Sequence, residues 1–363
     1  MSKFIISCGG TGGHVVPGIA IGQALIAAGH EVTFSISKKD VDARLVEKYK
    51  DLHFMKMPGI AFSKNPLQFL RFIRELIRAL LDGRRILISG NYDAVISFGG
   101  FNSLGLSLAA AWLGKPLILH EANRRTGKAT RFLGHFAKRV YVPFGVSIPR
   151  RKINQVKFAG YPLREEIRQM KKADAKKIFG FPESAKIILV LGGSQGAQAL
   201  NDWCHANFEN LAGKNCDVLC VCGQDKNTYE YREVKSPDGH MRMIKALEFC
   251  DNMAAALSCA DLVIARAGAG TIAELARCKV PSILVPYPYA ADNHQLENAK
   301  CFEKQGCCVV VEQKYMEKLF DEAVSILENP RLQETMKKNL ERVDEQNDCS
   351  KIVEDLTRLT AKE

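Results

Sequence analysis

The 363-residue chain has no apolar run long enough to cross a membrane. Its longest candidate, residues 104–114, falls far short of the roughly 20 apolar residues that a spanning helix needs. The first apolar run, FIIS at residues 4–7, continues into a glycine-rich loop without an A-x-A-like cleavage site. We therefore expect neither a membrane-spanning helix nor a signal peptide, and we interpret FIIS as a first strand.

No C-x-x-C pair occurs among the 12 cysteines, which are scattered along the chain. Cys220 and Cys222 are separated by a single residue. This pattern favours neither a zinc site nor a disulfide framework, and we expect reduced thiols in a cytoplasmic protein.

Acidic residues are absent from residues 122–164, which contain eleven Lys or Arg, and the whole chain has a net charge of +11. This asymmetry indicates an anionic partner, although a solvated basic face explains the charge equally well. A nucleic-acid-binding module is a rival interpretation, but we find no basic patch interleaved with aromatic residues and no reader motif. We do not expect nucleic acid as a partner.

The length of the chain and its alternation of strand and helix patterns predict two α/β domains. The length and the hydrophobic fraction of 47% suit a globular protein of two domains. Apolar β-type runs alternate with helical patterns in both halves, which indicates βαβ units and doubly wound parallel sheets. We place the domains at residues 1–162 and 163–343, joined near residues 156–164. The C-terminal helix, 344–363, is assigned to the first domain, although its apolar positions suit either one.

Each half opens with a strand, a glycine-rich turn and a helix, which is an arrangement able to approach an anion. The two segments are CGGTGGHVVPG at residues 8–18 and GGSQGAQALN at residues 192–201. Neither matches G-x-G-x-x-G, and no acidic residue lies in the usual place after the second strand to hold a ribose. Lys38, Lys39 and Asp40 close that strand instead. A Rossmann dehydrogenase is therefore not favoured.

His14 follows the first loop, ahead of a helix expected over about residues 18–28. A histidine at a helix N-terminus on the carboxyl edge of a sheet faces the crevice where ligands bind. The helix dipole favours the neutral ring there, and a neutral ring accepts a proton. His14 is thus a candidate general base, with a helix cap as the alternative.

Two further segments suit a nucleotide sugar. RAGAGTIAE at residues 266–274 places small residues before a helix N-terminus, which favours negative charge. Glu274 suits a sugar hydroxyl or simply offsets the helix dipole, and Arg164 suits a phosphate or the open surface. A polar cluster suits sugar hydroxyls or a solvated helix cap: Asp292, Asn293, His294, Gln295 and Asn298.

Two other patterns have competing interpretations. Asp40 and Asp42 have D-x-D spacing, but they begin a helix, so we interpret them as caps and expect no metal. Residues 67–81 combine a wide apolar face with Arg71, Arg74 and Arg78. This segment is either a helix on an anionic membrane surface or an ordinary packed helix.

Together, the motifs resemble the MurG family over nearly the whole chain. They are GGTGGHVVPG, HEAN at 120–123, GYPLR at 160–164, GGSQGAQALN, FCDNMAAAL at 249–257, RAGAGTIAE and DNHQLENA at 292–299. That family adds N-acetylglucosamine to lipid-linked muramyl pentapeptide in peptidoglycan synthesis. The resemblance implies a glycosyltransferase-B fold, in which two Rossmann-like domains face a cleft and the C-terminal domain holds UDP-GlcNAc. It also implies an acceptor, undecaprenyl-diphosphate-linked MurNAc-pentapeptide (lipid I), at the cytoplasmic face of the bacterial inner membrane.

The resemblance also assigns site residues. The substrate contacts that it implies are Thr11, Gly12, Gly13, Asn123, Arg164, Ser194, Cys250, Arg266, Ala269, Gly270, Thr271, Ile272, Ala273, Glu274 and Gln295. Among them, Arg164 and Ser194 contact the donor phosphates and Cys250 reads uracil through its backbone. Glu274 holds the ribose, and Gln295 and Asn123 contact the N-acetylglucosamine.

Three motifs depart from the family pattern. Ala122 stands where glutamine is common, Tyr161 where asparagine is common, and Ala267 and Gly270 where serine and leucine are common. None of these changes removes a group with an assigned chemical role, but Gly270 is expected to loosen the nucleotide pocket.

The resulting hypothesis is an inverting, single-displacement transfer with neither cofactor nor metal. His14 takes the proton from the C4 hydroxyl of MurNAc as lipid I becomes lipid II. A sterol or diacylglycerol glycosyltransferase, or a UDP-GlcNAc 2-epimerase, would share the donor half and differ on the acceptor side. These alternatives stay open on the residues alone.

Overall fold

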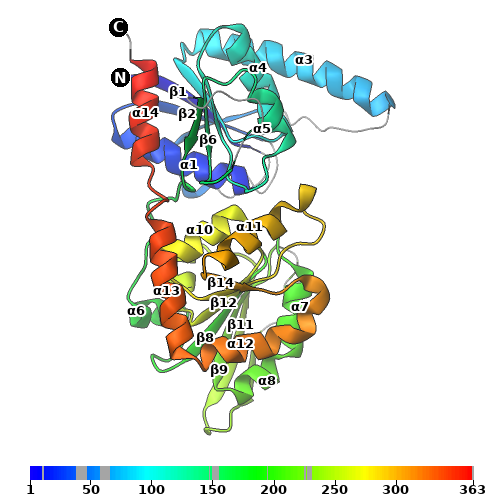
Figure 1. The fold of residues 1–363 in the computed structure, drawn as a ribbon, viewed down its shortest axis with the longest axis vertical. Coiled ribbons are helices and arrows are strands. Elements are labelled where there is room, and N and C mark those ends of the chain that lie inside the picture. Colours follow the sequence, from blue (N-terminus) through cyan, green and yellow to red (C-terminus); the bar gives the residue numbers. More distant parts are fainter. Residues whose placement is uncertain are drawn as a thin grey trace. The chain divides into compact units, whose positions relative to one another are not determined.

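The chain forms two compact units, each with its own seven-stranded sheet (Figure 1). The computed structural model describes residues 1–9, 12–37, 47–57, 66–146, 148, 155–193, 195–224, 226 and 231–361. Unit 1 comprises Met1–Glu165 with Gln346–Glu363, and unit 2 comprises Glu166–Glu345. Both units are α/β, so the prediction of two doubly wound α/β domains is confirmed.

Unit 1 is built on a parallel sheet with the strand order β3-β2-β1-β4-β5-β6-β7. The strands are β1 (Lys3–Ser7), β2 (Glu31–Ile36), β3 (His53–Lys56), β4 (Ala94–Ser97), β5 (Leu117–His120), β6 (Arg139–Val142) and β7 (Val156–Phe158). The central strands are buried on both faces, which explains why runs such as FIIS are continuously apolar. The strand order reverses between β1 and β4, which is where doubly wound sheets bind their ligands.

Helices cover both faces of this sheet. They are α1 (Gly12–Ala27), α3 (Pro66–Ser89), α4 (Leu104–Trp112), α5 (Lys128–Leu133) and α14 (Ser350–Thr360), with the short 3-10 helix η1 (Phe101–Ser103). One buried cluster joins the sheet to α1 and α14, and a second joins it to α3, α4 and α5. Helix α1 begins at Gly12, before the expected start at residue 18, and contains Pro17. Proline has no N–H, so α1 tolerates it with the loss of one backbone hydrogen bond.

Two helices end the chain, and the helix expected over residues 344–363 is the shorter Ser350–Thr360. Helix α13 (Pro330–Asp344) belongs to unit 2, whereas α14 packs on unit 1, where Ile352 and Leu356 are buried. The carboxylate of Asp355 lies 2.8 Å from Arg139 Nε and accepts a 2.8 Å hydrogen bond from the hydroxyl of Tyr141. These contacts fasten the end of the chain to β6.

Unit 2 has the strand order β10-β11-β9-β8-β12-β13-β14, with only the β10–β11 pairing antiparallel among the strands described. The strands are β8 (Lys186–Leu191), β9 (Cys216–Val221), β10 (Arg232–Lys235), β11 (Met241–Leu247), β12 (Leu262–Ala265), β13 (Ser282–Leu284) and β14 (Cys308–Val310). The sequence prediction missed β10, β11 and β14. The hairpin strands alternate polar and apolar residues and β14 is very short, so none of the three shows a long apolar run.

The helices of unit 2 also lie on both faces of its sheet (Figure 1). They are α6 (Lys172–Ile178), α7 (Gln198–Ala206), α8 (Phe208–Gly213), α9 (Met253–Cys259), α10 (Ala269–Cys278), α11 (His294–Lys304), α12 (Leu319–Leu327) and α13, with 3-10 helices η3 (Ala291–Asn293) and η4 (Gln313–Lys318). Residues of α7, α8 and α12 share one apolar core with β8, β9 and β12.

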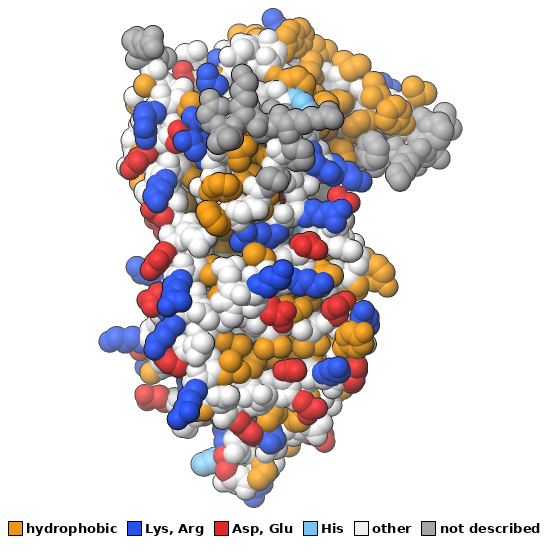
Figure 2. All heavy atoms as spheres, in the orientation of Figure 1, with side chains coloured by type: hydrophobic (Ala, Val, Ile, Leu, Met, Phe, Trp, Pro, Cys, Tyr) orange, Lys and Arg blue, Asp and Glu red, His pale blue; other side chains and the backbone are white. Residues whose placement is uncertain are grey.

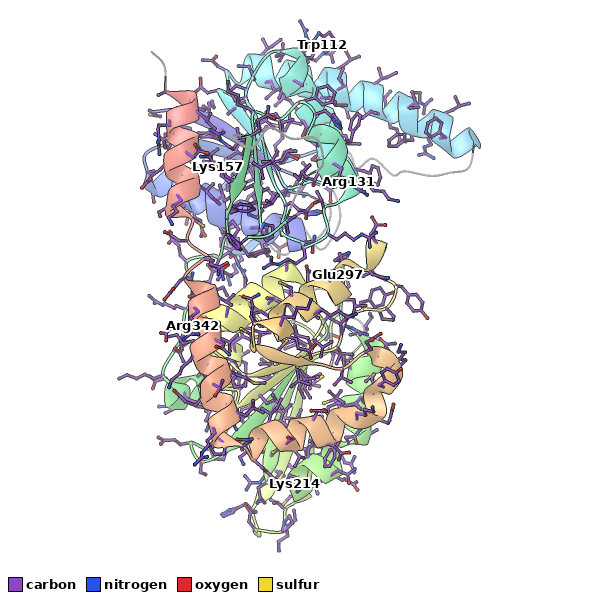
Figure 3. All side chains as sticks on the ribbon, in the orientation of Figure 1. Trp112, Arg131, Lys157, Lys214, Glu297 and Arg342 are labelled. Atoms are coloured by element: carbon purple, nitrogen blue, oxygen red, sulfur yellow. The ribbon has the colours of Figure 1, made fainter. Side chains whose placement is uncertain are left out.

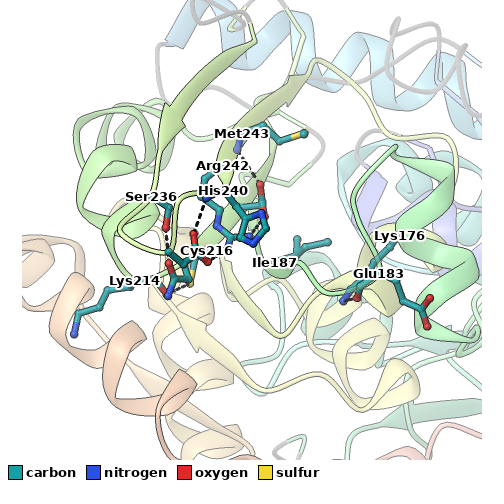
Figure 4. Close-up of polar contacts among 12 residues, drawn as sticks. Lys176, Glu183, Ile187, Lys214, Cys216, Ser236, His240, Arg242 and Met243 are labelled. Carbon is teal, nitrogen blue, oxygen red and sulfur yellow. Dashed lines mark hydrogen bonds and ion pairs between the residues drawn. The ribbon is translucent and has the colours of Figure 1, made fainter.

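A polar network fixes the β10–β11 hairpin to the start of β9 (Figure 4). The buried carboxylate of Asp217 accepts a 2.8 Å hydrogen bond from the N–H of Met243 and lies 3.5 Å from the guanidinium of Arg242. Arg242 also contacts Asp238. Burial raises the pKa of Asp217, and the bond from Met243 and the charge of Arg242 oppose that rise. This network holds β11 in place, and Cys250 follows β11.

Candidate functional site

The loops after β1, β4 and β5 lie at one edge of the unit 1 sheet, because the carboxyl ends of parallel strands share an edge. The first turn of α1 and the loop after β5 contain most of the residues predicted for the first half: Gly12, Gly13, His14 and Asn123. Thr11 lies outside the described residues. Gly12 is buried, whereas Gly13 is exposed at the start of α1.

His14 is the third residue of α1 and lies half-buried against the loop after β4. A Cβ added at Gly100 would lie 3.2 Å from Cε1 and 3.4 Å from Nδ1 of the His14 ring. Gly100 also has a φ of +78°, which favours glycine. A Cβ at residue 100 would therefore press on the imidazole and require it to shift by a few tenths of an ångström. Sequence reasoning missed Gly100, although the pair Gly99–Gly100 directly after an apolar strand was a visible signal.

Glu121 is a second residue that sequence reasoning missed. Its side chain is buried, and Oε1 accepts hydrogen bonds from the backbone N–H of Asn123 at 3.0 Å and from its Nδ2 at 3.2 Å. Oε2 accepts a third bond, 2.8 Å long, from the N–H of Gly127. Glu121 thus shapes the loop and orients the amide of Asn123, the predicted sugar contact. An acid directly after a buried strand was the only signal in the sequence.

His120, the first residue of HEAN, has a structural role. The ring is buried beside Phe98, and its Nε2 lies 3.3 Å from the carbonyl oxygen of Gly160. Burial lowers the pKa of His120 to about 4, because the charged imidazolium would lose its hydration. The ring is therefore neutral at pH 7 and enclosed by unit 1.

Arg164 is buried in unit 1 rather than displayed on an open surface. Its Nη1 donates a 3.0 Å hydrogen bond to the hydroxyl of Tyr49. The residues before Arg164 bond to the segment that follows α13. The N–H of Gly160 donates a 3.0 Å hydrogen bond to the carbonyl oxygen of Gln346, and the N–H of Tyr161 donates a 2.9 Å bond to Oδ1 of Asn347. The two segments that connect the units are thereby bonded to each other.

In unit 2, the glycine-rich turn after β8 is tightly packed. A Cβ at Gly192 would lie 2.3 Å from the nitrogen of Ala197, and one at Gly196 would lie 2.1 Å from the carbonyl oxygen of Cys222. Gly196 also has a φ of +65°. Ser194, the predicted phosphate contact, lies outside the described residues. The packing requires glycine at residues 192 and 196.

Helix α10 begins directly after β12 and presents its N-terminus at the carboxyl edge of the unit 2 sheet. Its N-cap is Gly268, whose lack of a side chain leaves the first turn without a side-chain cap. Residues 269–272 and Glu274 are half-buried, and Ala273 is buried. The first-turn N–H groups and the positive end of the helix dipole suit an anion.

Arg266 supports the neighbouring loop from within the fold. It is buried, and its Nη1 donates to the carbonyl oxygens of Val285 and Pro286 at 3.1 and 3.3 Å. Its Nη2 donates a 2.6 Å hydrogen bond to Oε1 of Gln313. Burial lowers the pKa of Arg266. The guanidinium therefore fixes the loop after β13.

Gln295 and Asn298 connect α11 to the same edge of the sheet. Gln295 Oε1 accepts a 3.0 Å hydrogen bond from the N–H of Tyr287, and Asn298 Nδ2 donates a 3.2 Å bond to the carbonyl oxygen of Ala267. Cys250 is buried on the loop after β11, and Asn252 caps α9 by accepting a 3.0 Å bond from the N–H of Ala255. The second-half motifs, from four different strands, thus share one edge.

No group of three or more His, Cys, Asp or Glu is arranged to hold a metal ion in the part of the chain that the structure describes. Asp40 and Asp42 lie outside that part. All 12 cysteines are described, and all are free thiols.

Comparisons with known proteins extend over the whole chain. The glycosyltransferase family 28 N-terminal domain matches residues 4–142, and the glycosyltransferase family 28 C-terminal domain matches residues 187–355. The UDP-N-acetylglucosamine-N-acetylmuramyl-(pentapeptide) pyrophosphoryl-undecaprenol N-acetylglucosamine transferase of Opitutus terrae is 46% identical over 99% of this chain and 96% of its own length. The transferase of that name from Thermoanaerobacter sp. (strain X514) is 31% identical over 99% of this chain and its full length. The chain belongs to this transferase family.

The solved structures agree on the fold. The crystal structure of MurG from Acinetobacter baumannii superposes with a TM-score of 0.72 at 24% identity, covering 98% of this chain and 99% of that one. The resemblance to the MurG family is therefore confirmed, and the chain is a glycosyltransferase.

Proposed function

We propose that this protein transfers N-acetylglucosamine from UDP-GlcNAc to the C4 hydroxyl of the MurNAc of lipid I, which forms lipid II. The observation that carries the proposal is the match over nearly the whole chain to transferases of this name. The arrangement of each unit supports the proposal. In unit 2, the groups suited to an anion and to sugar hydroxyls lie at the carboxyl edge of the sheet, and in unit 1, His14 lies at the carboxyl edge of the other sheet.

The donor binds at the carboxyl edge of the unit 2 sheet. Its diphosphate lies against the glycine-rich turn at residues 192–196 and the N-terminus of α10, where backbone N–H groups offset negative charge. Glu274 accepts a hydrogen bond from the ribose, and the backbone at Cys250 reads uracil. Gln295 contacts the N-acetylglucosamine through its amide NH₂, because its Oε1 already accepts a bond from Tyr287.

The reaction is a single displacement with inversion. The C4 oxygen of MurNAc forms a bond to the anomeric carbon of GlcNAc, while the bond from that carbon to the phosphate oxygen breaks. The bonding electrons leave with UDP, whose developing charge the α10 N-terminus stabilises. His14 takes the proton of the attacking hydroxyl and then releases it to water.

The acceptor carries a long lipid, so we also propose that unit 1 lies on an anionic membrane surface. Exposed apolar side chains lie along α3, in the region of unit 1 where hydrophobic atoms gather in Figure 2: Phe69, Leu70, Ile73, Ile77, Leu81 and Ile88. Exposed arginines flank them: Arg71, Arg74, Arg78, Arg84 and Arg85.

Two neighbouring helices of unit 1 carry the same kinds of residue. Trp112, at the end of α4, is 59% exposed, and Arg131 lies on α5 (Figure 3). The guanidinium of Arg84 lies 5.3 Å from the Trp112 ring centroid. Apolar and basic side chains together suit binding at the headgroup level of a bilayer. Among the described residues, no helix is long and apolar enough to cross one.

The direct test is transfer of labelled N-acetylglucosamine from UDP-GlcNAc to lipid-linked muramyl pentapeptide, followed by chromatography of the lipid product. We expect the label in a disaccharide lipid and the release of one UDP for each sugar transferred. Sterol and diacylglycerol acceptors are the controls. Transfer to these lipids alone, or conversion of UDP-GlcNAc to its 2-epimer without an acceptor, would contradict the proposal.

A further inference from the structure

An aromatic pair lies on the loop between β13 and α11. Tyr287 and Tyr289 form an edge-to-face contact, with ring centroids 5.7 Å apart. Tyr287 is 44% exposed and lies 5.5 Å from the Arg266 guanidinium, whereas Tyr289 is 81% exposed. Tyr289 thus presents its ring to solvent.

The loop that carries Tyr289 is fixed from both ends. Arg266 holds its start through the carbonyl oxygens of Val285 and Pro286, and Gln295 accepts the N–H of Tyr287. Backbone bonds close the loop internally, from Ala290 N to Tyr287 O at 3.2 Å and from Asn293 N to Ala290 O at 2.9 Å.

The loop then enters α11 through two consecutive residues in the left-handed region. Asp292 and Asn293 have φ values of +53° and +55°. Such backbone costs on the order of 1 kcal/mol per residue and clusters at binding sites, where it fixes the shape of a loop in advance. Tyr289 is therefore displayed on a loop of defined geometry beside Gln295, the proposed contact of the donor sugar.

A ring so exposed adds little to the stability of unit 2, because few of its atoms leave water on folding. Exposed aromatic side chains on a fixed loop are instead typical of recognition, since they bury a large area with few rotatable bonds to restrain. The face of a pyranose that bears its axial C–H groups is apolar and packs well on an aromatic ring.

We propose that Tyr289 is a platform for the N-acetylmuramyl ring of the acceptor, an inference that rests on the proposed function. In a single displacement the acceptor hydroxyl must reach the anomeric carbon, so the acceptor sugar lies directly beside the donor sugar. Gln295 and the backbone of Tyr287 fix the donor side of the loop. Tyr289 lies two residues after Tyr287 and takes no part in the bond between Gln295 and Tyr287. Its ring is therefore left to contact the acceptor sugar.

The test compares Tyr289→Ala, Tyr289→Phe and wild type in steady-state transfer with each substrate varied in turn. We expect Tyr289→Ala to raise the KM for lipid I about five- to tenfold, with the KM for UDP-GlcNAc and the Kd for UDP unchanged. Tyr289→Phe keeps the ring and should match wild type. Tyr231→Ala is the control, because Tyr231 is 55% exposed beside β10, which is the strand at the far end of the strand order from β13 and β14.

A second lipid-linked acceptor, which lacks the peptide stem, distinguishes a contact of Tyr289 with the sugar from a contact with the peptide. If Tyr289 packs on the sugar, Tyr289→Ala raises the KM of both acceptors by the same factor. An increase only for the acceptor with the stem, an increase in the KM for UDP-GlcNAc, or no change at all would overturn the inference. Failure of the wild type to use either acceptor would instead contradict the proposed function.

Discussion

Gly100 and His14 are far apart in the sequence, yet the position of the imidazole depends on the glycine. Gly100 combines a positive φ with a position at which an added Cβ would lie 3.2 Å from the His14 ring, so the ring would have to move by a few tenths of an ångström. Because the proposed base must meet the acceptor hydroxyl at hydrogen-bonding distance, a displacement of the ring by a fraction of an ångström matters for proton transfer.

We expect Gly100→Ala to lower kcat by about tenfold or more while leaving the Kd for UDP unchanged, because the added methyl displaces the His14 ring. Gly29→Ala is the matched control, since Gly29 has a φ of +84° in the same unit but no atom within 4 Å of its added Cβ. Both variants carry the backbone strain, and only the first disturbs His14. Equal kcat values for the two would contradict the dependence of His14 on Gly100.

His120 makes stability depend on pH. Its folded-state pKa of about 4 is below the unfolded value of about 6.5, so the unfolded chain binds the proton more readily between these values. The free energy of unfolding therefore keeps its full value above about pH 6.5 and falls as the pH is lowered, and it is about 3 kcal/mol smaller at pH 4. Urea unfolding at pH 7 and pH 4 measures it. His120→Asn should lose correspondingly less stability over this interval, and identical losses would refute the assignment.

At the scale of elements, α3 is a packed helix, as one interpretation of its sequence held, and the membrane-surface interpretation stays a prediction. It packs on α4 through small residues, since a Cβ at Gly83 would lie 3.1 Å from Leu106 Cα and one at Gly105 would lie 2.6 Å from Ala79 Cβ. This narrow stripe buries Phe72, Ala79 and Leu87, whereas other apolar side chains of the helix stay exposed: Phe69, Leu70, Ile73, Ile77, Leu81 and Ile88. The helix is an ordinary packed helix on one side and an apolar, basic surface on the other.

We expect the protein to bind vesicles that contain anionic lipid, with an affinity that falls as salt is raised. Arg74→Gln with Arg78→Gln should weaken binding by about 2 kcal/mol, or roughly 30-fold, at about 1 kcal/mol for each charge. Lys337→Gln with Lys338→Gln removes the same charge from the exposed face of α13 and should bind as wild type does. Equal losses in both pairs would indicate an effect of net charge rather than a membrane face on α3.

At the scale of the whole molecule, the sequence was sufficient for the central strands of both sheets, because these strands are continuous apolar runs. It did not predict the β10–β11 hairpin, whose alternating residues match no buried parallel strand. It also did not predict that Glu121 orients Asn123 or that Gly100 adjoins His14. The Gly100–His14 contact joins the ends of two different strands, and the Glu121–Asn123 contact forms within an irregular loop, so periodicity along one segment contains no information about either.

Arg266 marks another limit of the sequence. The motif at residues 266–274 predicted a substrate contact, and in unit 2 its guanidinium bonds to two carbonyl oxygens of the loop that leads to Tyr289. From the sequence, an arginine at this position suits either a substrate contact or a support for a neighbouring loop. Only its burial and its hydrogen-bond partners show that it supports the loop. The substrate contact stays a prediction.

In the proposed mechanism, unit 2 binds UDP-GlcNAc and His14 of unit 1 activates the acceptor. The most direct test is the transfer rate of His14→Ala at saturating concentrations of both substrates, measured together with the Kd for UDP. We predict that kcat falls by about 10²- to 10⁴-fold, the usual contribution of a general base, with the Kd for UDP unchanged. Full kcat in His14→Ala, or a loss that follows weaker UDP binding, would contradict this account.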